Sequence, residues 1–313
     1  MTRRREAIDL SPERIAAAVT RIDPVFLDTP QFVNEELSAA LSREVLIKNE
    51  SLTPIGSFKG RGTWLLADRL DRSKTWVCST AGNFGQGLAF AARARGAAVE
   101  AFVSAGVPAA KVAAMRALGA RVHMSERPGP DAREHAAASE DRLLVVDGLQ
   151  PEMAEGAGTI ALELQALGPI EVAVVQVGDG ALASGIACWL KHERPQTRIV
   201  GICASGAPAM ARSFNAGHVV STPDTDTIAT AIAICEPIPE SFARVIALVD
   251  EIVLVDDDDL RSAQHLILDA LGIAVEPAGA AGVAALARHR DRLPPGRTAV
   301  LLTGAGTPQP QEA

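Results

Sequence analysis

Strand-like and helix-like segments alternate along almost the whole chain, and this alternation constrains the fold more than any other feature. Apolar runs and alanine-rich helical patterns follow one another at 75–79, 84–95, 98–103, 170–177, 181–193 and 198–203. Parallel strands need a crossover connection of about this length between them. We therefore predict an α/β fold with two open, twisted, mostly parallel sheets that are flanked by helices.

A stretch rich in turn residues, Gly148–Gly158, separates two such series of segments. The chain has 313 residues, which is enough for two α/β domains. We predict a small domain over residues 75–150 and a large domain built from residues 1–74 and 151–313. Within the small domain, Glu126–Asp131 is rich in proline, glycine and charge and is expected to form a surface loop.

The charge balance argues against several classes of partner. The net charge is −8, whereas nucleic acid and anionic lipid both bind basic surfaces. No apolar run approaches the roughly 20 residues of a membrane span. We therefore expect a cytoplasmic protein that binds neither nucleic acid nor a membrane.

Cysteines and histidines form no metal-binding or catalytic motif. The cysteines are far apart in the sequence, without a CxxC pair, and are interpreted as small buried residues, with a reactive thiol as the alternative: Cys78, Cys188, Cys203 and Cys235. The six histidines are scattered, without an HExxH motif, and are interpreted as structural or solvated. We predict no metal site.

A glycine turn follows the apolar strand at 170–177 and opens a helix, with the sequence Gly178-Asp179-Gly180-Ala181-Leu182. Glycine lets backbone N–H groups approach a ligand closely, and a helix N-terminus favours an anion, so a phosphate would fit here. A turn that needs glycine for backbone reasons alone is the alternative. The carboxylate of Asp179 would repel a phosphate, so we expect it to face away.

Lys59 lies in the block SFKGRG at 57–62, just after a turn-like segment at 53–56. A lysine beside an aromatic residue at the start of a helix is partly desolvated, and the helix dipole also disfavours its ammonium form. Both effects favour the neutral amine that imine chemistry requires. A solvated surface lysine is the alternative interpretation of an isolated residue of this kind.

Four blocks taken together resemble one family. They are SFKGRG at 57–62, STAGNFGQG at 79–87, the glycine turn at Gly178 and TGAG at 303–306. In this order and spacing they resemble the fold-type II pyridoxal-phosphate (PLP) enzymes, the tryptophan synthase β-subunit superfamily, and within it the threonine/serine dehydratase branch. The resemblance runs from about Arg14 to Gly306. It implies PLP in a cleft between a large and a small domain, an amino-acid substrate and a homodimer.

The resemblance also implies roles for single residues. Lys59 would hold the cofactor as a Schiff base and, once freed by substrate, remove the Cα proton, while Phe58 would pack beside the ring. Asn83 would hydrogen-bond the phenolic oxygen, and Thr303 would lie at the pyridine nitrogen. The phosphate would be held by Gly178, Asp179, Gly180, Ala181 and Leu182. The substrate carboxylate would be received by Gln86 and by the backbone of Thr80, Ala81, Gly82 and Asn83.

Thr303 bears on the type of reaction. A hydroxyl can hydrogen-bond a neutral pyridine nitrogen, and the weaker electron sink that results favours prompt loss of a β-substituent. We therefore predict a PLP-dependent ammonia-lyase that eliminates water from a β-hydroxy amino acid, such as threonine or serine, to give a 2-oxo acid and ammonia. The alternatives are β- or γ-replacement, as in cysteine or threonine synthases, and a PLP-binding protein without turnover.

Several positions depart from the patterns of this family. Ala81 occupies the place of a second catalytic serine in serine racemases, which disfavours racemisation. Phe84 stands where dehydratases commonly have histidine, and Asp179 interrupts a turn that is usually richer in glycine. Glu276 either orders the pyridine edge of the cofactor or only opens the next helix.

Overall fold

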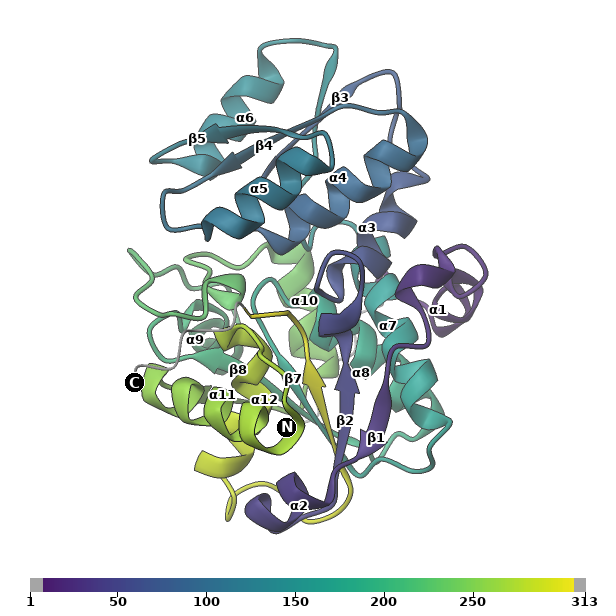
Figure 1. Ribbon diagram of the computed structural model, residues 1–313, viewed down its shortest axis with the longest axis vertical. Coiled ribbons are helices and arrows are strands. Elements are labelled where there is room, and N and C mark those ends of the chain that lie inside the picture. Colours follow the sequence, from purple (N-terminus) through teal and green to yellow (C-terminus); the bar gives the residue numbers. More distant parts are fainter. Residues whose placement is uncertain (1–7, 307–313) are drawn as a thin grey trace.

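The computed structural model describes residues 8–306, which form two sheets flanked by helices (Figure 1). The larger sheet has the strand order β1-β2-β10-β7-β8-β9 and the smaller the order β5-β4-β3-β6. Among the described strands of the two sheets, all pairings are parallel except that of β1 with β2. The predicted fold class is therefore confirmed. The strands are β1 (Gln31–Val33), β2 (Val45–Asn49), β3 (Thr75–Ser79), β4 (Val99–Val103), β5 (Arg121–Met124), β6 (Arg142–Leu144), β7 (Val172–Gln176), β8 (Arg198–Ala204), β9 (Glu251–Val255) and β10 (Thr298–Leu302).

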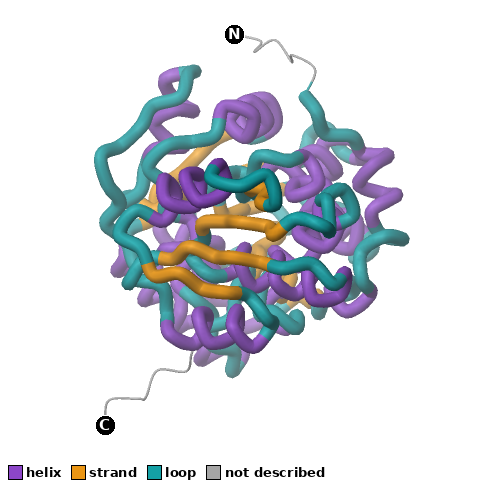
Figure 2. The backbone as a smooth tube through the Cα atoms, turned by 90° about the horizontal axis from the view of Figure 1, so that it is seen from above, coloured by secondary structure: helices purple, strands orange, loops and turns teal. Residues whose placement is uncertain are grey.

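Helices lie on either side of the strands, as the view in Figure 2 shows. They are α1 (Pro12–Ala18), α2 (Glu35–Leu41), α3 (Lys59–Ala67), α4 (Asn83–Arg95), α5 (Ala109–Ala117), α6 (Pro128–Ala137), α7 (Pro151–Gln165), α8 (Ala181–Glu193), α9 (Ala209–Ala216), α10 (Pro239–Leu248), α11 (Asp257–Leu271) and α12 (Pro277–Arg288). Short 3₁₀ turns occur at Pro24–Phe26, Glu50–Leu52 and Thr230–Ile232. Among the described residues, no helix is both long and apolar enough to cross a bilayer.

The strands at the centre of the larger sheet are buried on both faces. Every residue of β2, β7 and β10 is buried, which matches the continuous apolar runs expected of parallel strands covered by helices. The sheet sends the carboxyl ends of β7 and β10 toward the smaller sheet, so the loops that follow them lie between the two sheets (Figure 1). Ligands of open α/β sheets bind at such strand ends.

Two turn-like segments of the sequence are helical instead. Helix α7 begins at Pro151 and runs through Gly156 and Gly158, so the expectation of a turn-rich joint at 148–158 is wrong for most of its length. A Cβ atom at Gly156 would lie 2.6 Å from the Cα atom of Gly62 in α3. Glycine is required there because two helices touch, not because the chain turns. Helix α6 likewise begins at Pro128 inside the expected loop at 126–131, since proline is tolerated in a first helical turn.

The division into a small and a large domain stays a prediction. Strands β3 to β6 lie within the predicted small domain, at one end of the molecule in Figure 1. Residues 1–7 and 307–313 of the predicted large domain lie outside the described residues.

Candidate functional site

The sequence blocks singled out above meet at the carboxyl ends of three strands. The segment Thr80–Asn83 follows β3, the turn at Gly178 follows β7, and Thr303 follows β10. The SFKGRG block joins them through its backbone, because the N–H of Phe58 donates to the carbonyl of Thr303 at 3.2 Å. The N–H of Ala305 donates in turn to the carbonyl of Gly56 at 2.7 Å.

Lys59 is the first residue of α3, and its side chain is only 12% exposed. Its Nζ atom donates to both carboxylate oxygens of Asp147, at 2.7 and 2.6 Å. The rings of Phe58 and Phe84 lie nearby, with centroids 5.2 and 6.0 Å from Nζ. The amine is therefore held between aromatic rings and one carboxylate rather than solvated at the surface. Asp147, which lies in the loop after β6, belongs to no motif and was missed by sequence reasoning.

Asp179 lies close to this ion pair. Burial, reinforced by the negative charge of Asp147, raises the pKa of Asp179 to about 7, although the charge of Lys59 opposes the shift. The expectation that this carboxylate faces away from a bound phosphate stays a prediction. Asp179 packs closely against Gly148, where an added Cβ atom would lie 2.7 Å from the Cβ atom of Asp179.

The glycine turn gives α8 an open N-terminus. Gly180 has a φ of +98°, and the first intrahelical bond is made by the N–H of Ser184 to its carbonyl. Within the described chain, the N–H groups of Ala181, Leu182 and Ala183 have no hydrogen-bond acceptor, as expected for a first helical turn. The hydroxyl of Ser241 donates to the carbonyl of Asp179 and holds the turn in place. The free N–H groups and the helix dipole make this turn suitable for an anion.

A cavity of about 720 Å³ lies between two pairs of helices. The N-terminal ends of α4 and α5 line one side of it, and residues of α11 and α12 line the other. The predicted substrate-binding residues Asn83 and Gln86 line it, together with Lys111 and Glu276. Phe58, Lys59 and Thr303 are not among the described residues that line it. The structure thus places Asn83 and Gln86 in the wall of the cavity and the group around Lys59 outside that wall.

Glu276 links the two sides of this cavity. Its Oε1 atom accepts a hydrogen bond from Nδ2 of Asn83 at 2.8 Å, and its Oε2 atom pairs with Nζ of Lys111. A Cβ atom at Gly304 would lie 2.2 Å from Oε1, so a side chain there would displace the Glu276 carboxylate from this position. Sequence reasoning singled out Glu276 and Asn83 but did not connect them, and it missed Lys111.

The segment Thr80–Asn83 is shaped by its own hydrogen bonds. The hydroxyl of Thr80 accepts from the N–H groups of Gly82 and Gly85, at 2.9 and 3.0 Å. Gly82 has a φ of +127°, a backbone conformation that residues with a side chain rarely adopt. The segment, including Ala81, therefore forms a fixed turn at the start of α4.

A buried ionic cluster fixes α3 behind Lys59. Arg61 is fully buried and donates to the carboxylates of Glu50 and Glu163, at distances of 2.5 to 3.0 Å. Burial opposes its charge, but the two carboxylates outweigh this and raise the pKa of Arg61. Lys48, also buried, shares Glu163 with it. The arginine of the SFKGRG block is thus structural.

Three of the four cysteines are buried. Burial raises the pKa of the Cys78 and Cys203 thiols to about 12 and that of Cys188 to about 11, whereas Cys235 is exposed. Three of the four thus match the interpretation as small buried residues.

These residues fit pyridoxal phosphate. A mostly buried amine suits an aldehyde, the open N-terminus of α8 suits a phosphate, and the buried Thr303 offers a hydroxyl. Within the glycine turn, the Asp179 carboxylate opposes a phosphate when it is ionised. The family model described as "Pyridoxal-phosphate dependent enzyme" matches residues 22–304. The chain belongs to this family. Its cofactor is pyridoxal phosphate.

Individual relatives show which members of the family this PLP enzyme is similar to. An L-threonine ammonia-lyase of Geobacter sulfurreducens is 34% identical over 278 residues, which are 87% of this chain and 69% of the relative. The crystal structure of a T.th. threonine deaminase superposes with a TM-score of 0.88 at 29% identity, over 95% of this chain and 99% of the other. Maize serine racemase gives a TM-score of 0.86 at 25% identity, over 96% and 94%.

Proposed function

We propose that the chain is an ammonia-lyase that eliminates water from a β-hydroxy amino acid, such as threonine or serine, and releases a 2-oxo acid and ammonia. The observation that carries the proposal is the position of the Lys59 amine, which is largely buried, bonded to Asp147 and close to the anion-binding turn of α8. The similarity to a threonine ammonia-lyase supports the reaction type.

When bound, pyridoxal phosphate supplies an electron sink that makes the Cα–H bond of an amino acid acidic. Lys59 would hold the cofactor aldehyde and, once free, would accept the Cα proton at Nζ. Asp147, whose carboxylate oxygens lie 2.7 and 2.6 Å from Nζ, would accept hydrogen bonds from the ammonium group so formed. A positioned base of this kind accelerates proton transfer by about 10²- to 10⁴-fold.

The other predicted residues hold the reactants in place. The N–H groups of the turn from Gly178 to Leu182 would bind the phosphate, and Thr303 would donate to the pyridine nitrogen. Phe58 would pack beside the ring, and the Asn83 amide, which donates to Glu276, would bind the phenolic oxygen. The turn from Thr80 to Asn83 would receive the substrate carboxylate, together with Gln86, which lines the cavity.

Racemisation is the competing reaction, favoured by the similarity to maize serine racemase. A racemase needs an acid on the face of Cα opposite Lys59. Ala81 offers no hydroxyl at the place where the racemases have serine, so elimination is the reaction we favour.

The cellular setting and the assembly are part of the same proposal. A cytoplasmic location is supported by the acidic composition and by the metabolic role of such a reaction. A homodimer is supported by the resemblance to the fold-type II enzymes, and light scattering of the purified holoenzyme tests it.

The decisive experiment compares Lys59→Ala with Lys191→Ala. Lys191 is a matched control, because it is also largely buried and pairs with an aspartate, Asp250, at 2.8 Å. After incubation with PLP and desalting, the wild type and Lys191→Ala should keep the cofactor's visible absorbance band, and Lys59→Ala should lose it. A panel of L- and D-serine and L- and D-threonine is then assayed for 2-oxo acid and for the opposite enantiomer.

Each outcome distinguishes one function. Oxo acid from a β-hydroxy amino acid, lost in Lys59→Ala alone, supports the proposal. Formation of the enantiomer without oxo acid would establish a racemase. Incorporation of an added thiol into the product would establish replacement chemistry, and a visible band without turnover would leave only a binding role.

A further inference from the structure

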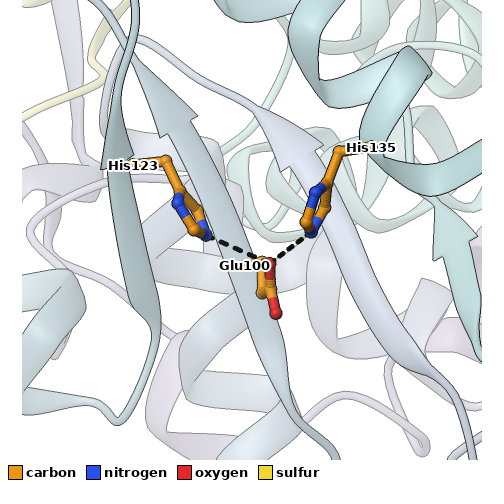
Figure 3. A group of neighbouring side chains, drawn as sticks. All are labelled: Glu100, His123 and His135. Carbon is orange, nitrogen blue, oxygen red and sulfur yellow. Dashed lines mark hydrogen bonds and ion pairs between the residues drawn. The ribbon is translucent and has the colours of Figure 1, made fainter. Parts of the chain in front are cut away.

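A second group of reactive side chains lies on the smaller sheet, away from the site around Lys59. Glu100 comes from β4, His123 from β5 and His135 from α6, and the three side chains point toward one another (Figure 3). The Oε2 atom of Glu100 lies 3.0 Å from Nε2 of His123 and 2.5 Å from Nε2 of His135. None of the three is among the described residues that line the cavity beside Glu276.

The setting of Glu100 is unusual for a carboxylate. Its side chain is 11% exposed, and it faces the apolar group that includes Phe102 and Ala132, packed between the sheet and α6. Burial of a carboxylate is costly unless a partner compensates its charge. A third partner, the largely exposed Arg121, lies only at 3.4 Å. The two imidazoles are therefore the main groups available to balance this charge.

The imidazoles are held in place by a shared aromatic neighbour. The Phe102 ring stacks on His123, with centroids 4.6 Å apart and an interplanar angle of 17°, and lies 5.2 Å from the ring of His135. Side chains that packing holds in this way are the kind that bind a metal without a large loss of rotamer freedom. His123 and His135 remain 32% and 25% exposed, so an ion can enter from solvent.

We propose that Glu100, His123 and His135 form a binding site for a divalent transition-metal cation of the zinc type. The three ligand atoms lie within 4.8 Å of one another, and Zn²⁺ binds two imidazole nitrogens and one carboxylate oxygen at about 2.0–2.2 Å. The cation replaces the two Glu100–histidine hydrogen bonds and leaves one coordination position to water. Two nitrogen ligands exclude Mg²⁺ and Ca²⁺, which prefer oxygen.

The bound cation fastens three elements of the smaller sheet together. Strands β4 and β5 are neighbours in that sheet, and α6 packs on its face, so one ion joins the sheet to the helix that covers it. The role is structural, because the site lies apart from the residues that handle the substrate. Binding to the folded state alone therefore raises stability by mass action.

The spacing of the ligands explains why the sequence did not reveal them. Glu100 and His123 are 23 residues apart, and His135 is 35 residues from Glu100, with no short motif between them. Only the pairing of β4 with β5, and the packing of α6 on β4, brings them together. The prediction of no metal site is replaced by this proposal.

Titration of chelator-stripped, PLP-loaded protein with ZnCl₂ by calorimetry tests the site. The wild type should bind one equivalent, and His135→Gln and Glu100→Gln should bind more than about 100-fold more weakly, since even outer-shell partners contribute 10- to 100-fold. His192→Gln is the matched control, because that exposed histidine also lies beside a glutamate, at 3.7 Å from Glu193. It should bind as the wild type does, and MgCl₂ should bind to none of them.

Thermal unfolding with and without ZnCl₂ gives the second readout. The melting temperature of the wild type and of His192→Gln should rise with Zn²⁺, whereas that of His135→Gln should not. If His135→Gln fails to fold, the more exposed His123→Gln takes its place in both measurements. Wild-type protein that binds no Zn²⁺, or histidine variants that bind it as tightly as the wild type, would overturn the proposal and leave a hydrogen-bonded structural cluster.

Discussion

The Nζ atom of Lys59 lies 2.6 Å from Oδ2 of Asp147, a residue 88 positions further along the chain. Lys59 begins α3, and Asp147 follows β6 of the smaller sheet, so the pair connects two separate parts of the fold. Both side chains are largely buried, at 12% and 20% exposure. Because both side chains are largely buried, this pair differs from the exposed ion pairs at protein surfaces, which contribute little to stability. The carboxylate is thus positioned to stabilise a proton on the lysine.

Asp147→Asn should therefore slow turnover while the protein still captures PLP. The amide keeps the size of the side chain but cannot balance the charge of an ammonium group, so we expect kcat to fall about 10- to 100-fold with little change in KM. Steady-state kinetics on the best substrate of the panel provide the measurement. Asp250→Asn, which breaks the matched pair with Lys191, should leave kcat unchanged. Equal losses in both variants would show a general loss of stability instead.

Asp179 should make stability depend on pH. Its pKa is raised from 3.8 to about 7 in the folded protein, mainly by burial, so the folded state binds more protons than the unfolded state between these values. Its contribution to the free energy of unfolding is thus present in full below about pH 4 and is lost as pH rises through about 7. Asp179→Asn removes this dependence. In urea unfolding of the cofactor-free protein, the variant should gain stability relative to wild type between pH 5 and pH 8.

The same carboxylate should affect cofactor binding. Above pH 7 the ionised Asp179 repels a phosphate at the turn of α8, so PLP should bind wild type more weakly at pH 8 than at pH 6. Titration of the cofactor-free protein with PLP, followed by its absorbance, measures this ratio. The ratio should change in Asp179→Asn, with less weakening at pH 8 than in the wild type. A ratio that is the same in both proteins would mean that the carboxylate does not face the phosphate.

Much of the fold could be predicted because the periodicity is strong. The apolar run at 75–79 coincides with β3, and the helix predicted at 181–193 coincides with α8. The glycines of α7 could not be interpreted in the same way. The sequence does not show whether a glycine permits a turn or lets two helices touch. Gly156 lets α7 touch α3 at Gly62. Only the partner helix distinguishes the two cases.

The candidate site was predictable where short blocks carry it. Lys59 and Asn83 lie in such blocks. In the structure, the residue before Lys59 hydrogen-bonds Thr303, and the Asn83 amide hydrogen-bonds Glu276. Asp147 was not predictable, because an isolated aspartate after a short strand carries no signal until tertiary packing places it beside the lysine. The same holds for Lys111, which reaches Glu276 from α5, across the cavity.

Glu276→Gln should lower kcat/KM more than it lowers the stability of the fold. Glu276 accepts from the Asn83 amide and pairs with Lys111, and hydrogen bonds to a charged group contribute about 1.5–3 kcal/mol, so kcat/KM should fall about 10- to 100-fold. A double-mutant cycle with Lys111→Met isolates the pair. If the two residues act together, the double variant should lose little more than either single variant. Additive losses would show that they act separately.

Gly156→Ala should separate α7 from α3 and disturb Lys59 from a distance. The added Cβ atom would lie 2.6 Å from the Cα atom of Gly62, which is backbone and cannot turn aside. Overpacking of this kind costs about 1–3 kcal/mol, measured as the free energy of unfolding in urea. Gly129→Ala in α6 is the control, because its nearest neighbour is 3.9 Å away and a helical alanine is favoured over glycine by about 1 kcal/mol. Because α3 begins at Lys59, Gly156→Ala should also capture less PLP at a given concentration, whereas Gly129→Ala should capture as much as wild type. Unchanged stability in Gly156→Ala would mean that the helices can move apart freely, and the glycine contact would then not be what positions the lysine.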